Sequence, residues 1–153
     1  MQLPQDFKEF IELLNIHEVQ YVMIGGWVYN LYAPPRMTGD IDFLVSTSAD
    51  NELKLRHVLT DFGFGSSLPD PKLPWLAPHK VIMLGREPCR LDILCRIDGV
   101  TFEEAFQDRR IIIFDGVSVP VLSIETLMRN KEAAGRDKDL LDLKTLREIV
   151  KSS

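Results

Sequence analysis

The chain has 153 residues, of which 45% are hydrophobic and 27% are charged, and its formal net charge is −5 at pH 7. These values predict one folded domain over residues 1–153 and exclude a disordered or fibrous chain. The acidic balance argues against a protein that binds nucleic acid broadly through its phosphates, although a local basic patch is compatible with it.

The first residues and the cysteines bear on the location of the protein. MQLPQDFKEF lacks the charged segment and apolar run of a signal peptide, and the longest apolar stretches are too short to span a bilayer. Cys89 and Cys95 form no C-x-x-C pair and would lie too far apart on one strand to bond within it. We therefore expect a cytoplasmic protein with reduced thiols and no membrane association.

The N-terminal segment predicts a helix, a strand and a second helix. Apolar residues at a 3.6-residue period predict an amphipathic helix over 5–17. YVMIG predicts a buried strand over 21–25 that ends in a tight turn at Gly25-Gly26. WVYNLYA predicts a short helix over 27–33, because the two prolines that follow disfavour its continuation.

The next segment predicts a strand, a helix and a long loop. DIDFLVS predicts a strand over 40–46, and Asp50 is the candidate N-cap of a helix that reaches about residue 62. Residues 63–79 are rich in glycine and proline, which predicts one irregular loop. Loops of this length in a domain are often functional.

The second half of the chain predicts two hairpins separated by a short helix. KVIMLG (80–85) and CRLDILCRI (89–97) predict antiparallel strands, and Thr101 with Glu104 forms a capping-box pattern for a helix over 101–108. RIIIF and VSVPVL flank Asp115-Gly116, a strong signal for a two-residue hairpin turn.

The C-terminal segment, 123–150, predicts two helices. Ser123 should cap a helix that runs to about Ala134 and ends at Gly135. A last helix over roughly 137–150 carries a predicted core stripe of Leu140, Leu141, Leu143, Leu146, Ile149 and Val150. Helices mixed with hairpins predict an α+β fold with a mixed sheet flanked by helices.

Asp40 and Asp42 stand one residue apart in the second predicted strand. Successive side chains of a strand point to opposite faces, so both carboxylates should leave the same face, with Cα atoms about 7 Å apart. Two like charges on one face repel each other unless a cation lies between them, and hard oxygen ligands suit Mg²⁺. An Asp-x-Asp pair alone also fits a solvated strand edge, so neighbouring motifs must decide.

Gly25-Gly26 lies between the first strand and a helix. Because glycine has no Cβ, backbone N–H groups there can approach phosphate oxygens, and a helix start adds a favourable dipole. Strand, Gly-Gly turn, helix and Asp-x-Asp strand together predict a phosphate-binding turn that faces a metal site. The G-x-G-x-x-G pattern is absent, which argues against a dinucleotide-binding site.

This pattern resembles the DNA polymerase β-like nucleotidyltransferase superfamily, in which a Gly-Gly or Gly-Ser turn precedes an Asp-x-Asp/Glu strand. Thirteen residues lie between Gly26 and Asp40. IGGW…RMTGDIDFLV is especially similar to the minimal bacterial members, namely AbiEii-like toxins and lincosamide-type antibiotic nucleotidyltransferases. The similarity covers residues 20–97 and extends more weakly to KEAAGRDKDLLDL.

The resemblance implies a third carboxylate on a later strand, and Asp92 in RLDIL fits that place. Asp40, Asp42 and Asp92 would then be the catalytic groups and hold two Mg²⁺ ions, with Mn²⁺ as an alternative and Asp92 as candidate general base. The implied reaction transfers a nucleoside monophosphate from a nucleoside triphosphate, such as ATP, to a hydroxyl or amine and releases pyrophosphate. The acceptor, whether small molecule, protein or tRNA, is left open.

Trp27 departs from the family pattern. Many members carry serine directly after the glycine, and its hydroxyl reaches a phosphate. In this chain, phosphate contact would depend on backbone N–H groups at Gly25 and Gly26 and on basic side chains.

Basic and hydroxyl side chains supply further nucleotide-binding candidates. Arg36 and Thr38 precede Asp40 and could reach phosphate, although Arg36 fits equally well as a structural partner of Asp40 or Asp42. Lys131 has no acid four residues further on, which favours a nucleotide-binding role.

Arg136 and Lys138 could also face the triphosphate, but ion pairs with the neighbouring Asp137, Asp139 and Asp142 are the favoured interpretation.

Arg90 and Trp75 have weaker assignments. Arg90 shares the strand face of Asp92 and could orient its carboxylate. Trp75 in the long loop could stack on a base, although a packing role is favoured.

Two alternative functions fit the same pattern. One is a non-catalytic nucleotide- or partner-binding module on this fold, and the other is a toxin paired with a separate antitoxin partner.

Overall fold

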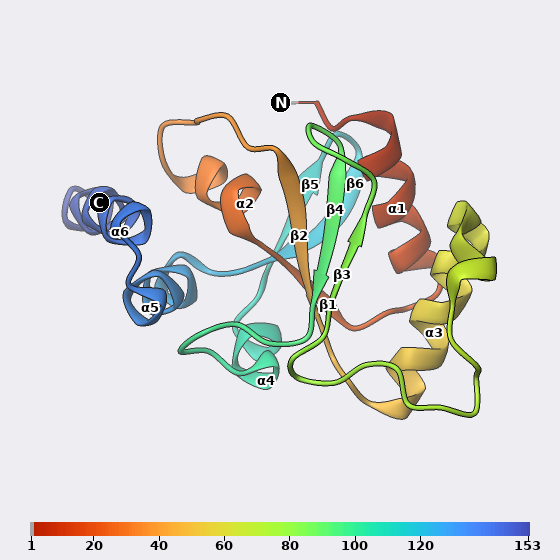
Figure 1. Ribbon diagram of the computed structural model, residues 1–153. Coiled ribbons are helices and arrows are strands. Elements are labelled where there is room, and N and C mark those ends of the chain that lie inside the picture. The colour runs from red at the N-terminus through yellow and green to blue at the C-terminus, as the bar shows by residue number, and fades with distance from the viewer. Residues whose placement is uncertain (1) are drawn as a thin grey trace.

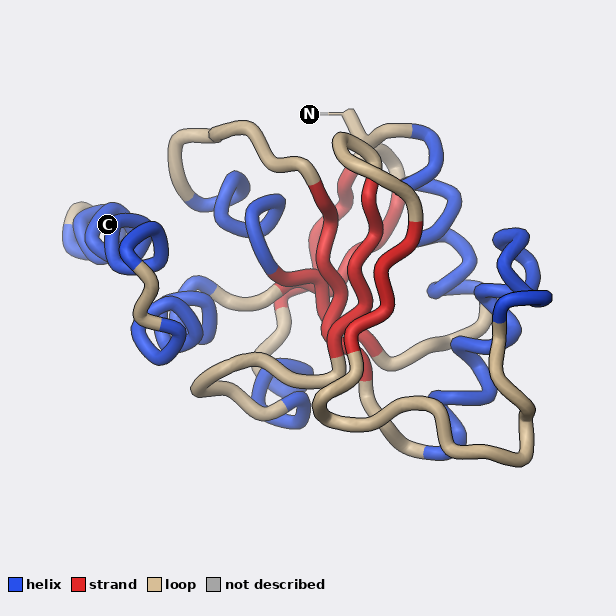
Figure 2. The backbone as a smooth tube through the Cα atoms, in the orientation of Figure 1, coloured by secondary structure: helices blue, strands red, loops and turns tan. Residues whose placement is uncertain are grey.

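The apolar strand segments assemble into one six-stranded sheet in the computed structural model, which describes residues 2–153 (Figures 1 and 2). Across the sheet the strand order is β3-β4-β2-β1-β6-β5. The strands are β1 Tyr21–Ile24, β2 Asp40–Val45, β3 Val81–Leu84, β4 Arg90–Leu94, β5 Arg110–Phe114 and β6 Val117–Val121. Strand β1 is parallel to β6 and β2 is parallel to β4, whereas the other neighbours are antiparallel. The predicted mixed sheet is confirmed.

Helices cover both faces of this sheet. Within residues 2–153 they are α1 Gln5–Ile16, α2 Gly25–Tyr32, α3 Ala49–Leu59, α4 Phe102–Gln107, α5 Ile124–Ala134 and α6 Asp137–Lys151. Figure 1 shows α1 and α3 on one side of the sheet and α2, α5 and α6 on the other. The α+β class predicted from the element order is therefore confirmed.

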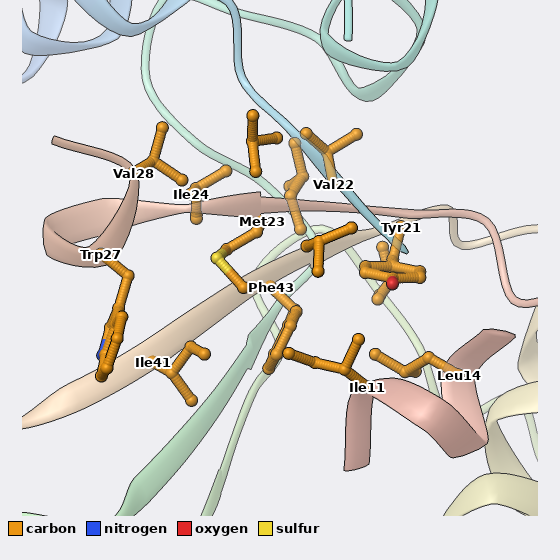
Figure 3. Close-up of a cluster of buried hydrophobic side chains, with 14 of the residues drawn as sticks. Ile11, Leu14, Tyr21, Val22, Met23, Ile24, Trp27, Val28, Ile41 and Phe43 are labelled. Atoms are coloured by element: carbon orange, nitrogen blue, oxygen red, sulfur yellow. The ribbon is translucent and has the colours of Figure 1, made fainter. Parts of the chain in front are cut away.

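The core between the sheet and α1 determines which way the strand β2 side chains point. Phe10 of α1 packs on Phe43 of β2 with ring centroids 5.5 Å apart, and Ile41 and Phe43 are fully buried. Figure 3 shows Phe43 beside Ile11 of α1. Because side chains alternate along a strand, Asp40 and Asp42 point to the opposite face.

Several local predictions are confirmed by the backbone. Asp115 and Gly116 both have positive φ, 53° and 80°, as a two-residue hairpin turn requires. Thr101 and Glu104 form the capping box of α4. Gly135 ends α5 in the left-handed region with φ 65°.

The boundaries of α2 and α3 differ from the predictions. Helix α2 begins at Gly25, two residues earlier than predicted, but Gly25 itself has φ 77°, outside the helical region, so the chain turns at the glycine pair as predicted. Ser48 caps α3 by accepting a hydrogen bond from the Asn51 N–H, and Asp50 lies in the first turn instead. The α-helix ends at Leu59 and continues as a single π turn, Thr60–Phe64.

The loop predicted over 63–79 begins after Phe64; residues 65–79 contain one short 3₁₀ turn, Gly65–Ser67, and are otherwise irregular. Two side chains of α3 hold this loop. Arg56 donates to the carbonyl of Pro69 at 2.7 Å, and Glu52 accepts from the N–H groups of Trp75 and Leu76. The loop is therefore attached to the α3 side of the sheet.

The predicted core stripe of the last helix is partly wrong. Leu143 and Leu146 are buried, but Leu140, Leu141 and Val150 are exposed. Helix α6 packs mainly against α5, so one narrow face is covered and the flanking leucines remain in solvent. Among residues 2–153, no helix combines the length and the apolar character needed to cross a bilayer.

Strand β4 is shorter than predicted, so Cys89 and Cys95 flank it. Both cysteines are free thiols.

Candidate active site

Two parallel strands bring the predicted carboxylates together. In the register of β2 and β4, Asp40 lies opposite Arg90 and Asp42 lies opposite Asp92. One carboxylate oxygen from each of Asp40, Asp42 and Asp92 lies within 4.8 Å of the others. The structure therefore brings into one cluster the three residues that sequence reasoning selected.

Arg90 bridges two members of this cluster. Its Nε donates to Oδ1 of Asp92 at 2.9 Å and its terminal nitrogen donates to Oδ2 of Asp92 at 3.0 Å. The same terminal nitrogen donates to Oδ2 of Asp40 at 2.9 Å. Hydrogen bonds to Asp92 raise the pKa of Arg90 further above its usual value. The bidentate contact fixes the Asp92 carboxylate plane, which the shared strand face predicted.

Asp42 has no ion-pair partner among the described residues. Burial, followed by the charges of Asp40 and Asp92, raises the pKa of Asp42 to about 7. Burial and the neighbouring Asp92 also raise the pKa of Asp40. Three carboxylates and one guanidinium leave two negative charges uncompensated when all are ionised.

The chemistry of this donor set fits a divalent metal. Hard carboxylate oxygens converge from two adjacent strands, and their residual charge matches that of a divalent cation. Burial and the mutual repulsion of the carboxylates raise the pKa values of Asp40 and Asp42, and a divalent cation would relieve that repulsion. Asp40, Asp42 and Asp92 are therefore the residues that could hold Mg²⁺.

The glycine pair borders this cluster directly. Ile24 pairs with Asp42 across β1 and β2, and Gly25 follows with φ 77°. A Cβ at Gly25 would overlap the Asp42 carboxylate, so a larger residue cannot be accommodated without displacing it. A Cβ at Gly26 would lie 2.8 Å from Oγ1 of Thr38, which itself donates to the Asp40 carbonyl. The glycines thus let the start of α2 approach the carboxylates.

The cluster lies in a cleft of about 810 Å³. Strands β2 and β4 and the start of α2 form one wall, with the carboxylates. Residues of α5, α6 and the segment before β2 form the opposite wall. Asp139 lies in this wall, but four basic side chains outnumber it: Arg36, Lys131, Arg136 and Lys138. An acidic wall that faces a basic wall suits a metal-bound polyphosphate.

Lys131 and Arg36 meet at one buried carboxylate of α6. The same oxygen, Oδ2 of Asp142, lies 2.9 Å from Nζ of Lys131 and 2.6 Å from a terminal nitrogen of Arg36. Lys131 also lies 3.5 Å from Asp139. No acid lies four residues after Lys131, but the turn between α5 and α6 returns Asp139 and Asp142 to it, so Lys131 is paired across two helices. The alternative pairing of Arg36 with Asp40 or Asp42 is wrong.

The sequence indicated Asp142 only as a local partner of Arg136 or Lys138, and its contacts with Lys131 and Arg36 were not predicted. Its spacing from Lys131, eleven residues across a helix turn, gives no helical signal, and only the packing of α6 on α5 brings the two together. Arg136 pairs with Asp139 at 2.7 Å, as the local interpretation predicted. His79 and Arg96 also line the cleft, and no motif pointed to them.

The two tryptophans have packing roles. Trp27 is 9% exposed and packs edge-on against Phe7 and Phe114, at centroid distances of 6.0 and 5.7 Å. Trp75 lies under the guanidinium of Arg56 on the α3 side and does not line the cleft. The residue that directly follows the glycine pair, Trp27, therefore faces the core.

Three solved structures share this fold. The lincosamide antibiotic adenylyltransferase LnuA, crystallised with lincomycin, is 16% identical, with a TM-score of 0.58 over 97% of this chain and 98% of LnuA. A Thermotoga maritima protein described as a putative nucleotidyltransferase is 16% identical, with a TM-score of 0.55 over 96% of this chain and 91% of that one. An antigenic nucleotidyltransferase-like protein of Paracoccidioides brasiliensis is 15% identical, with a TM-score of 0.56 over 97% and 76%.

No protein-family model matches the chain, and no curated protein matches its sequence. The structural likenesses, at 15–16% identity, establish the fold. The chain has the nucleotidyltransferase fold that its sequence resemblance predicted.

Proposed function

We propose that this protein transfers a nucleoside monophosphate from a nucleoside triphosphate to an acceptor hydroxyl or amine and releases pyrophosphate. The observation that carries the proposal is the convergence of Asp40, Asp42 and Asp92 within 4.8 Å in a cleft whose opposite wall is basic. A polyphosphate needs both the metal-binding carboxylates and the basic wall, because its charge must be neutralised and its reacting phosphorus must be positioned.

The three carboxylates would hold two Mg²⁺ ions, with Mn²⁺ as a substitute. When bound, the metal supplies charge neutralisation on the phosphate oxygens and lowers the pKa of an acceptor hydroxyl. The chain's own contribution is orientation. Arg90 locks Asp92 in one plane and ties Asp40 to it, so that the carboxylates present their oxygens in a fixed arrangement.

The basic wall would bind the triphosphate. Lys131 and Arg36 are held by Asp142, so their positions are set before any ligand enters. Lys138 takes part in no ion pair among the described residues and is free to reach a phosphate. Backbone N–H groups at Gly25 and Gly26 would contact phosphate from the side of α2.

Asp92 is the proposed general base for the acceptor. It is buried, it lies beside Asp42 in the register, and its strand neighbours Leu91 and Ile93 are buried in the core. The acceptor is drawn from small hydroxylated molecules, proteins and tRNA. The lincomycin-bound LnuA structure supports testing small molecules first.

A labelled-transfer screen tests the proposal. Purified protein is incubated with each α-³²P-labelled nucleoside triphosphate, Mg²⁺ and three acceptor pools: lysate protein, total tRNA and hydroxylated small molecules. We expect label transfer to at least one pool, loss of transfer in Asp42→Asn and full transfer in Asp6→Asn, an exposed site on α1.

The result that contradicts the proposal is calorimetric binding of triphosphate and Mg²⁺ without transfer to any pool. That outcome identifies a non-catalytic nucleotide-binding module. Transfer together with growth arrest on expression, relieved by Asp42→Asn, identifies a toxin and calls for a search for its antitoxin.

A further inference from the structure

Strand β5 is an outer strand of the sheet with an unpaired edge. It hydrogen-bonds only to β6, and no other backbone segment among residues 2–153 pairs with it. The other outer strand, β3, differs because Val81 at its start lines the active-site cleft. The β5 edge lies at the opposite end of the sheet, and none of its residues lines that cleft (Figure 1).

The register with β6 shows which backbone groups β5 offers to solvent. Ile111 lies opposite Pro120, which has no N–H, so this pair is a non-hydrogen-bonded pair of the ladder. The alternation of antiparallel pairs places Ile113 and Ser118 in the same class. The N–H and C=O groups of Ile111 and Ile113 therefore point outward, away from β6.

The same two residues also carry exposed apolar side chains. Ile111 is 59% exposed and Ile113 is 73% exposed, on one face of the strand. Outer strands are usually protected by inward charges, proline, bulges or a covering segment. RIIIF contains no proline, and its regular register with β6 contains no bulge.

We propose that β5 is a self-association edge, at which a second copy of this chain pairs antiparallel with β5 about a two-fold axis that passes between the Ile112 residues of the two copies. In this register Ile111 of one copy faces Ile113 of the other, and the outward backbone groups of these residues meet as hydrogen-bonded pairs. Their exposed side chains become cross-strand isoleucine neighbours on one face. The pairing joins the two sheets into one continuous sheet.

The charges at the ends of β5 fit a second copy in this orientation. Arg109 and Arg110 stand at the beginning of the strand, where Arg110 pairs with Asp108 and one positive charge is left in excess. Asp115 follows the end of the strand, and one of its carboxylate oxygens accepts from the Leu3 N–H. Antiparallel pairing brings the basic end of each copy beside Asp115 of the other. A parallel arrangement would place arginines beside arginines, so charge favours the antiparallel two-fold pairing.

The expected dimer is weak. A contact between two five-residue strands is smaller than the roughly 800 Å² per partner of a standard stable interface. We expect a concentration-dependent equilibrium in the micromolar range, where about 8 kcal/mol of association free energy corresponds to a Kd near 1 μM. The cleft remains open in the dimer, and the inference is independent of the proposed reaction.

Sedimentation velocity of the full chain from about 1 to 200 μM tests the inference, because this range brackets a micromolar Kd. We expect the weight-average mass to rise from 17.5 kDa toward twice that value. Ile113→Lys should remain at the monomer mass throughout. The matched control is Ile16→Lys, at an isoleucine of α1 that is 70% exposed, and it should dimerise like the wild type.

Ile113→Pro separates strand pairing from simple apolar contact. It removes one outward N–H, leaves the hydrogen-bonded pairs with β6 intact, and is tolerated at an outer strand. We expect it to weaken dimerisation at least tenfold while circular dichroism stays unchanged. A wild type that is monomeric at 200 μM, or an Ile113→Lys variant that dimerises as the wild type does, overturns the inference.

Discussion

Burial and the two neighbouring carboxylates, Asp40 and Asp92, disfavour the ionised form of Asp42 and raise its pKa to about 7. In the unfolded chain this carboxyl titrates near 4, so between pH 4 and 7 the folded state binds the extra proton. The stability that this proton provides is fully present below pH 4 and is lost as pH rises through about 7. We therefore expect the metal-free protein to lose stability from pH 5 to pH 8.

Asp42→Asn removes the unfavourable buried charge, and it also removes activity. In EDTA at pH 8 we expect the variant to gain about 1–2 kcal/mol, or roughly 2–8 °C in Tm, and to lose nucleotidyl transfer. Thermal unfolding at pH 5 and pH 8 measures the effect. Asp6→Asn is the control, and equal Tm profiles for the wild type and Asp42→Asn would contradict the electrostatic account.

For single residues, the sequence predicted the structure best where neighbouring residues within one strand or turn determine it. The alternation of Asp40 and Asp42 follows from strand geometry. The third acid, Asp92, was implied only by the family resemblance that the Gly-Gly pair and the Asp-x-Asp strand carry. The partners of Lys131 were not predictable, because they depend on how α6 returns along α5. A search for acids four residues away tests one helix face and not the packing of two helices.

The ion-pair cluster that joins α5, α6 and the segment before β2 is an element-scale feature. Lys131 is 6% exposed, and its removal leaves Asp139 and Asp142 buried with less compensation. We expect Lys131→Met to cost about 3 kcal/mol of unfolding free energy. Chemical denaturation measures this cost.

A second substitution separates the structural role of Lys131 from nucleotide binding. In Lys131→Met/Asp142→Leu one of the uncompensated charges is gone, so stability should recover by about 2 kcal/mol relative to Lys131→Met. Nucleotide affinity, measured by calorimetry, should stay reduced. Asp142→Leu alone is the control, because it releases Arg36 but keeps Lys131. Recovery of both properties would show that Lys131 acts on the fold alone.

The ends of the helices differ from the predictions where two nearby residues can serve the same structural role. Both Ser48 and Asp50 are good N-caps, and the structure uses Ser48. Leu140 and Leu141 fit a helical core stripe by period, but α6 covers only one narrow face because α5 is its main neighbour. Hydrophobic period predicts that a helix forms, whereas the number of surfaces packed on it decides which leucines are buried.

At the scale of the whole molecule, the uncompensated charge of the carboxylate cluster links stability to divalent metal. Mg²⁺ that binds the folded but not the unfolded chain stabilises it by mass action, by about 1–3 kcal/mol at concentrations well above the Kd. Because the raised pKa of Asp42 lets a proton compete for the same oxygens, Mg²⁺ should raise Tm more at pH 8 than at pH 6.

Thermal unfolding with and without 10 mM Mg²⁺, at constant ionic strength, measures this linkage, since a screened surface effect depends on salt and not on site. Asp42→Asn and Asp92→Asn should lose the response, because each removes one oxygen ligand of the cluster. Asp6→Asn should keep it. A Tm response that is equal at both pH values, or that survives in the cluster variants, would show that Mg²⁺ binds elsewhere. The three carboxylates would then have only a structural role, as the ion-pair partners and neighbours of Arg90.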